Sequence, residues 1–148
     1  MIRLAREMDK PMLVHARESI DRLLKIMQRE GADQVGGVFH AFSGSVETAQ
    51  RIIDAGFLLG IGGVVTWPGA RRLPEVVRTV PAAALLLETD APYLKPRNLR
   101  PKVKSHRNEP RFLPWIAGTL AAVRNEHPEH LAAQTTANAR RFFRIQAP

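Results

Sequence analysis

Short apolar runs alternate four times along the chain with longer segments in which apolar residues recur every three or four positions. The runs cover residues 12–14, 35–39, 57–61 and 84–87, and each is followed by a polar or glycine-containing stretch. The spacing between them predicts helices around residues 20–27, 46–53 and 73–80, with two more over 112–123 and 131–143. Nearly continuous apolar strands separated by helices are typical of a parallel sheet that is covered on both faces.

Polar residues that can bind a metal or transfer a proton lie where these runs end. His15 and His40 close the first two runs, and Asp90 follows the fourth. A doubly wound sheet and a (β/α) barrel both fit the spacing, but no Gly-x-Gly-x-x-Gly follows a strand, which argues against a dinucleotide site. In a barrel, the carboxyl ends of the strands form the rim where active sites are built.

The start of the chain influences the expected domain organisation. Residues 2–8 have helical spacing and run into Lys10-Pro11, yet no capping residue precedes Ile2. A full barrel needs eight strand–helix units and about 250 residues, whereas four units are visible in 148 residues. We therefore expect residues 1–148 to be one partial α/β domain, the C-terminal half of a TIM (β/α)8 barrel with about four parallel strands, whose N-terminal strands are missing.

Charge and composition restrict the binding partners and the metal ligands that the chain can have. The formal net charge of +8 favours anionic partners such as nucleic acid, although an arginine-rich background composition explains it equally well. Since the chain has no cysteine, any metal must be held by His, Asp or Glu. Neither an apolar leader nor a run long enough to span a membrane is present in the sequence, so we expect a cytoplasmic protein with no membrane partner.

His15 and His40 are candidate metal ligands. A single strand-end histidine is easily explained as a hydrogen-bonded rim residue, but two on consecutive strands should lie close together, and neutral imidazole binds Zn, Mn or Fe well. Asp90 adds a carboxylate that can bind a metal or accept a proton from water. It is an unsuitable helix cap because Pro92 follows so soon. Strand alternation places Glu88 on the same face, one layer deeper.

Five segments together resemble the TatD family of metal-dependent deoxyribonucleases. They occur in the family's order over essentially the whole chain: 10–15 (Lys-Pro-Met-Leu-Val-His), 40–44 (His-Ala-Phe-Ser-Gly), 87–94 (Leu-Glu-Thr-Asp-Ala-Pro-Tyr-Leu), 107–110 (Arg-Asn-Glu-Pro) and 136–143 (Thr-Ala-Asn-Ala-Arg-Arg-Phe-Phe). The resemblance implies a TIM barrel of the amidohydrolase type with two divalent cations in the intact site. It also implies that the enzyme hydrolyses phosphodiester bonds in nucleic acid, with DNA as the expected substrate. It does not distinguish Mg, Mn and Zn.

The resemblance also implies roles for individual residues. His15 and His40 match two ligands of one metal, and Asp90 matches the aspartate beside the other metal and the nucleophilic water, which makes it the catalytic candidate. Glu88 and Arg107 are secondary candidates, Arg107 as a contact for a nucleic-acid backbone within a basic loop. The family's His-x-His pair and its bridging glutamate have no counterpart in the sequence.

These missing ligands leave a second function open. The chain is then a non-catalytic remnant that acts at most as a nucleic-acid-binding or self-associating module. An open half-barrel is expected to expose its edge strands together with interior residues such as Leu13, Val38 and Leu86. Open parallel edges pair readily with another chain, so we expect a homo-oligomer.

Overall fold

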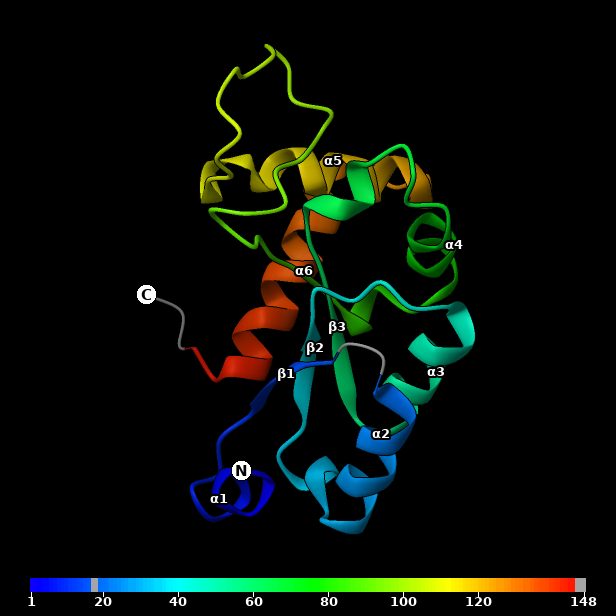
Figure 1. Ribbon diagram of the computed structural model, residues 1–148, viewed down its shortest axis with the longest axis vertical. Helices are drawn as coiled ribbons and strands as arrows, with labels where there is room; N and C mark the ends of the chain where they lie inside the picture. The colour runs from blue at the N-terminus through cyan, green and yellow to red at the C-terminus, as the bar shows by residue number, and fades with distance from the viewer. Residues whose placement is uncertain (17–18, 146–148) are drawn as a thin grey trace.

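The computed structural model describes residues 1–16 and 19–145 and contains a parallel sheet with the order β1-β2-β3-β4 (Figure 1). The strands are Met12–His15 (β1), Gly37–His40 (β2), Phe57–Ile61 (β3) and Leu85–Leu87 (β4). Each pairs in parallel with the next, with His15 opposite His40 and Gly60 opposite Leu86. The predicted α/β fold with four parallel strands is confirmed.

Helices connect the strands and cover the sheet. They are α1 (Ile2–Glu7), α2 (Ile20–Arg29), α3 (Val46–Asp54), α4 (Arg72–Thr79), α5 (Leu113–Arg124) and α6 (Pro128–Phe143), with 3-10 turns η1 (Ala32–Gln34), η2 (Gly63–Thr66), η3 (Ala82–Ala84) and η4 (Pro110–Phe112). All of the predicted helices are present, and α3 begins as expected, because the Ser45 hydroxyl accepts a hydrogen bond from Thr48 N–H. Within the described residues, no helix is both long and apolar enough to cross a membrane.

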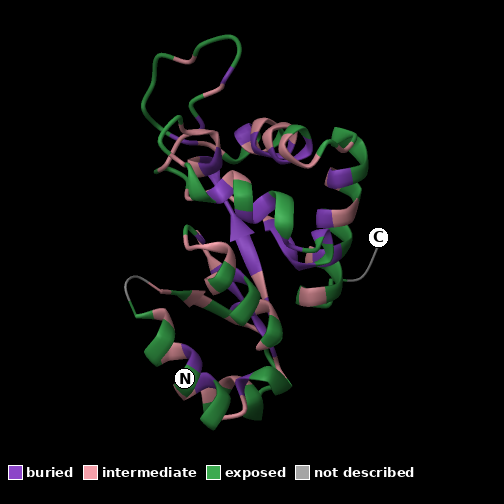
Figure 2. Cartoon of the chain, turned by 90° about the vertical axis from the view of Figure 1, so that its right-hand side faces the viewer, coloured by how far each residue is buried: buried purple, intermediate pink, exposed green. Residues whose placement is uncertain are grey.

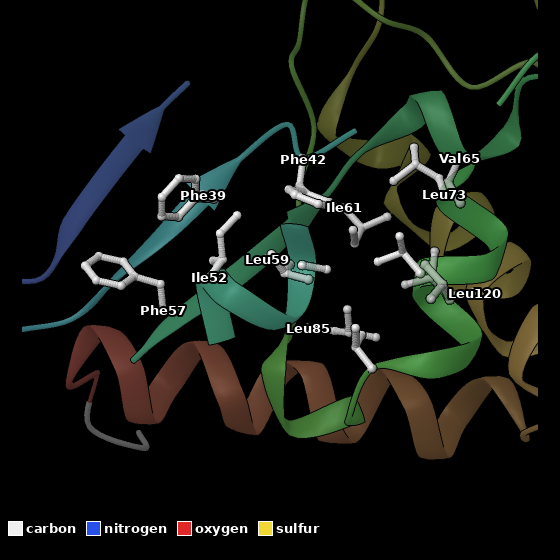
Figure 3. Packing of buried hydrophobic residues seen from close by; sticks show 14 of the residues in the cluster. Phe39, Phe42, Ile52, Phe57, Leu59, Ile61, Val65, Leu73, Leu85 and Leu120 are labelled. Atoms are coloured by element: carbon white, nitrogen blue, oxygen red, sulfur yellow. The ribbon is translucent and has the colours of Figure 1, made fainter. Parts of the chain in front are cut away.

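The main core lies between the sheet and the helices that follow each strand. Phe39, Phe57, Leu59, Ile61 and Leu85 point from β2, β3 and β4 into this layer (Figure 3). Ile52 of α3, Val76 of α4 and Leu120 of α5 meet them and are fully buried. Figure 2 shows the buried residues concentrated along the strands and the inner helix faces.

The opposite face of the sheet carries Leu13, Val38 and Leu86, which we expected to be exposed together. Only Leu13, on the edge strand β1, is exposed, at 71%; Val38 and Leu86 are 2% and 5% exposed. The expectation is wrong for Val38 and Leu86. Val38 is on an inner strand and stands between Leu13 and Leu58 in the strand register, so both of its sides are flanked by side chains. Leu86 is buried although β4 is an edge strand and its register partner is Gly60.

Helix α6 ties the N-terminal ends of the strands together. The buried Asn138 side chain donates hydrogen bonds of 2.8 and 2.9 Å to the carbonyls of Ala82 and Leu85, where β4 begins. Further along α6, Phe142 lies near Gly36, just before β2. Arg144 then pairs with Asp9, before β1. The Arg144 hydrogen bond holds the pKa of Asp9 below its usual value, so this pair stabilises the fold at neutral pH and loses its effect as acid protonates Asp9.

Replacing Asn138 tests this role of α6. In Asn138→Ala two buried carbonyls lose their donor, and we expect the free energy of unfolding in urea to fall by about 1–3 kcal/mol. The exposed Thr136 on the same helix provides the matched control, and Thr136→Ala should change stability by less than about 0.5 kcal/mol. Equal effects of the two substitutions would contradict the anchoring role of Asn138.

Candidate metal centre

The centre is a cluster of three side chains at the carboxyl ends of β2 and β4. His40 Nδ1 lies 3.0 Å from Glu88 Oε2, and His40 Nε2 lies 3.0 Å from Asp90 Oδ1. One ligand-type atom from each residue falls within 4.8 Å of the other two. All three side chains are partly buried, with exposures of 32% for His40, 17% for Glu88 and 14% for Asp90. The cluster therefore has the donor types and the spacing that a divalent cation requires.

Two glycines between β2 and β4 leave space for these carboxylates: Gly60 is in β3, and Gly62 follows it directly. A Cβ at Gly60 would overlap the Glu88 carboxylate, and a Cβ at Gly62 would lie 3.1 Å from Asp90 Oδ2. Gly60 is paired with Leu86 in the register, so Glu88, two residues on, points to the same face and leans over β3. The absence of a side chain at position 60 lets the Glu88 carboxylate reach across to His40.

The two carboxylates of the cluster have different surroundings. Both Glu88 oxygens have donors, since Oε1 accepts from Ala41 N–H and Oε2 faces His40 Nδ1. Asp90 Oδ2, in contrast, is buried without a hydrogen-bond partner in the described part of the chain. A buried carboxylate oxygen with no donor is costly unless a cation or a proton balances it. Asp90 Oδ2 is therefore the carboxylate oxygen of the cluster that is available to bind a cation or a proton.

The surroundings of His40 shift its pKa in opposing directions. Burial alone lowers the pKa of the imidazole, but the hydrogen bond and charge of Glu88, followed by the charge and hydrogen bond of Asp90, outweigh burial and raise it above its usual value. Each carboxylate occupies one ring nitrogen. A carboxylate on Nδ1 fixes the orientation of a histidine ring, and here it directs Nε2 at the Asp90 carboxylate.

Comparison with known proteins shows which family has this sequence and this fold. The sequence profile of the family described as TatD related DNase matches residues 1–144. The chain belongs to the TatD family. The resemblance seen in the five sequence segments is thereby confirmed. A TatD relative from Bacillus subtilis, described as the uncharacterized metal-dependent hydrolase YabD, is 40% identical over 144 residues. A second, from Erwinia billingiae, carries the name 3'-5' ssDNA/RNA exonuclease TatD and is 43% identical over 149 residues.

The match covers only part of these TatD proteins. It spans 97% of this chain and 55% of YabD, and 99% of this chain and 56% of the Erwinia protein. The crystal structure of the Escherichia coli TatD homologue YJJV superposes with a TM-score of 0.87 at 30% identity, covering 98% of this chain and 54% of that one. The chain thus spans about half the length of its TatD relatives and has the fold of the corresponding part of a TatD barrel.

His15 and Arg107 were expected near the TatD site, and the structure places them differently from His40. The His15 ring lies beside that of His40, with centroids 6.0 Å apart, but His15 is outside the three-residue cluster. The edge strand β1 leaves it exposed. Arg107 lies in the exposed loop before η4, and its described hydrogen bond joins its backbone N–H to the Ser105 hydroxyl. Glu88, predicted only as a secondary candidate, is in contact with His40 itself.

Sequence reasoning missed residues that shape the site without bearing its chemistry. Ala41, directly after His40, has a positive φ of 50°, a strained conformation for alanine that lets its N–H meet Glu88. Asn108 is buried and donates a 2.7 Å hydrogen bond to the Tyr93 carbonyl beyond Asp90. An isolated Gly60 within an apolar run was the one available signal for a close approach.

Gly60→Ala tests whether Glu88 depends on an empty position in β3. The added methyl group should push the carboxylate off His40 and destabilise the fold by about 1–3 kcal/mol, and the His40 imidazole resonances should shift in an NMR spectrum. Gly118, in the middle of α5, has no atom within 4 Å of an added Cβ. Gly118→Ala should therefore stabilise the protein by about 0.5–1 kcal/mol and leave His40 unchanged. Unshifted His40 resonances in Gly60→Ala would contradict the proposed coupling.

Proposed function

We propose that this chain carries part of the active centre of a metal-dependent hydrolase that cuts phosphodiester bonds in nucleic acid. The observation that supports it most strongly is the His40–Glu88–Asp90 cluster, with its buried and unpartnered Asp90 Oδ2. The names of the relatives agree with it, since one is called a metal-dependent hydrolase and another a 3'-5' ssDNA/RNA exonuclease.

The residues divide into ligands and a positioning group. His40 Nε2 and Asp90 are the ligands that we propose, with His15, the neighbouring exposed imidazole, as a third. Glu88 is the positioning residue, because both of its oxygens already accept hydrogen bonds from the His40 ring and from Ala41. Fixing Nδ1 in this way directs Nε2 toward Asp90. We further propose that the intact site takes two cations, as the family resemblance implies.

A divalent cation held by His40 and Asp90 would supply a lowered pKa for water and neutralisation of charge on a phosphoryl oxygen. Asp90 Oδ2 is the atom available to accept a proton from the attacking water, because it has no competing donor among the described residues. Beside His40 a hollow of about 430 Å³ is lined by Ser43, Gly44 and Arg72, among others. Its position and the exposed arginine suit a phosphate group of the substrate.

Metal binding can be measured by calorimetry. We expect Zn to bind with micromolar rather than nanomolar affinity, and Mg far more weakly, because the site offers two imidazoles and one free carboxylate. His40→Ala should weaken Zn binding by about 10- to 100-fold. His130, an exposed histidine on α6, serves as the matched control, and His130→Ala should leave the affinity unchanged. Equal affinities for the His40→Ala protein and the wild type would refute the site.

The 148 residues contain no His-x-His pair, and this absence of expected metal ligands favours a second function. In this alternative the chain binds nucleic acid without cutting it. Incubation of a labelled single-stranded DNA oligonucleotide with Mn distinguishes the two. Hydrolysis that disappears in Asp90→Asn supports the enzyme, whereas intact oligonucleotide at all protein concentrations supports the binding module.

We also propose that the isolated chain self-associates. Within the described residues β1 and β4 each pair on one side only, and Leu13 is 71% exposed on the β1 edge. Unpaired parallel edges favour pairing with another chain. Light scattering at micromolar concentration should give the mass of a dimer or larger species. A single species at 16.5 kDa with a cooperative melt would contradict this proposal.

A further inference from the structure

The loop between β4 and η4 contains a segment with an unusual concentration of positive charge. Residues 95–107 read Lys-Pro-Arg-Asn-Leu-Arg-Pro-Lys-Val-Lys-Ser-His-Arg, with six Lys or Arg, one His and no Asp or Glu. Most of it is exposed (Figure 2), and it extends well beyond the helices at one end of the molecule (Figure 1). We call residues 95–107 the basic segment.

Acidic side chains do not neutralise this charge. Arg51, Arg124 and Arg144, elsewhere in the protein, are each paired with a carboxylate. None of the described ion pairs includes a residue of the basic segment. A group of uncompensated cations produces a local field that attracts polyanions.

The basic segment is held in place by hydrogen bonds at both ends. The Lys95 ammonium donates to the carbonyls of Val103 and Ser105, which closes the segment on itself. Asn98 donates to the Thr119 hydroxyl on α5, and Asn108 donates to the Tyr93 carbonyl. A pre-formed loop loses less entropy on binding than a free one, so these anchors favour recognition over simple solvation.

The anchors place the start of the basic segment close to the metal centre. It begins five residues after Asp90, and a Cβ on Gly63, after β3, would collide with the Leu94 carbonyl and lie 3.2 Å from Pro96 N, so the segment begins beside the end of β3. Between Asp90 and the segment stands Tyr93, whose side chain is 73% exposed. An exposed aromatic ring beside uncompensated cations is the combination that binds single-stranded nucleic acid.

We propose that Tyr93 and the basic segment bind single-stranded nucleic acid and guide it to the His40–Glu88–Asp90 cluster. The cations contact phosphates, and the Tyr93 ring stacks on one base. A duplex keeps its bases stacked and offers none to Tyr93. A lipid surface is disfavoured because the segment presents no large aliphatic side chain to insert: Leu99 is only 4% exposed and Val103 is partly buried. This inference rests on the proposed function, because it describes how a nucleic-acid substrate reaches the proposed metal centre.

The first test uses the metal-free protein in EDTA and a fluorescein-labelled oligo-dT, with anisotropy measured at several salt concentrations. Lys102→Ala, Lys104→Ala and Arg107→Ala combined should weaken binding and reduce the slope of log K against log salt by about 0.7 for each phosphate that is no longer neutralised. Arg22→Ala, Lys25→Ala and Arg140→Ala remove the same charge from exposed positions on α2 and α6. Equal reductions in affinity for both triple variants would overturn the proposal, as would equal wild-type affinity for phosphatidylserine vesicles.

The second test isolates stacking. Tyr93→Ala should reduce affinity for oligo-dT by about 5- to 100-fold, the usual cost of removing one base–aromatic stack, while Tyr93→Phe keeps the affinity. With an abasic oligonucleotide of the same length, Tyr93→Ala should have no effect. A reduction of the same size on the abasic strand, or none on oligo-dT, would overturn the role of Tyr93. Because no metal and no cleavage are involved, failure of the metal centre leaves both tests readable.

Discussion

The parallel hydrogen-bonded register of the four strands is the constraint on which the site depends. Because β2 and β4 run in the same direction, His40 and Asp90 come out at the same edge although they are fifty positions apart in the sequence. Strand β3, which lies between them, supplies no side chain at Gly60, so Glu88 reaches across it from the end of β4 to His40 on β2. An antiparallel partner at either place would send one of the groups to the opposite end.

Much of this arrangement follows from the sequence. The apolar runs predict the strands because residues buried on both faces of a parallel sheet must be apolar throughout, and β3 matches its run, residues 57–61, in full. The periodic segments predict the helices because one face of each packs on the sheet, as Ile52 and Val76 do. Histidine and aspartate at strand ends predict the edge of the sheet where His40, Glu88 and Asp90 come together.

Other features depend on geometry that the order of residues does not reveal. Strand alternation placed Glu88 one layer below Asp90, but its contact with His40 depends on the empty position at Gly60, and its contact with the Ala41 N–H depends on the positive φ of Ala41. His15 carries the same strand-end signature as His40, yet it lies on an edge strand with one neighbour and remains outside the cluster. The burial of Val38 and Leu86 likewise depends on what covers that face of the sheet in three dimensions, which an alternation pattern cannot encode.

Because the Glu88 carboxylate occupies the space where a side chain at position 60 would lie, substitutions at positions 60 and 88 are expected to be coupled in evolution. A larger residue at position 60 leaves no volume for the carboxylate that orients His40, and a shorter acid at position 88 cannot cross the strand to use that space. A substitution at either position alone thus removes the contact that orients His40, the proposed metal ligand, even though Gly60 has no chemistry of its own. Relatives that keep a glutamate at 88 are expected to keep a glycine at 60, and the two should disappear together.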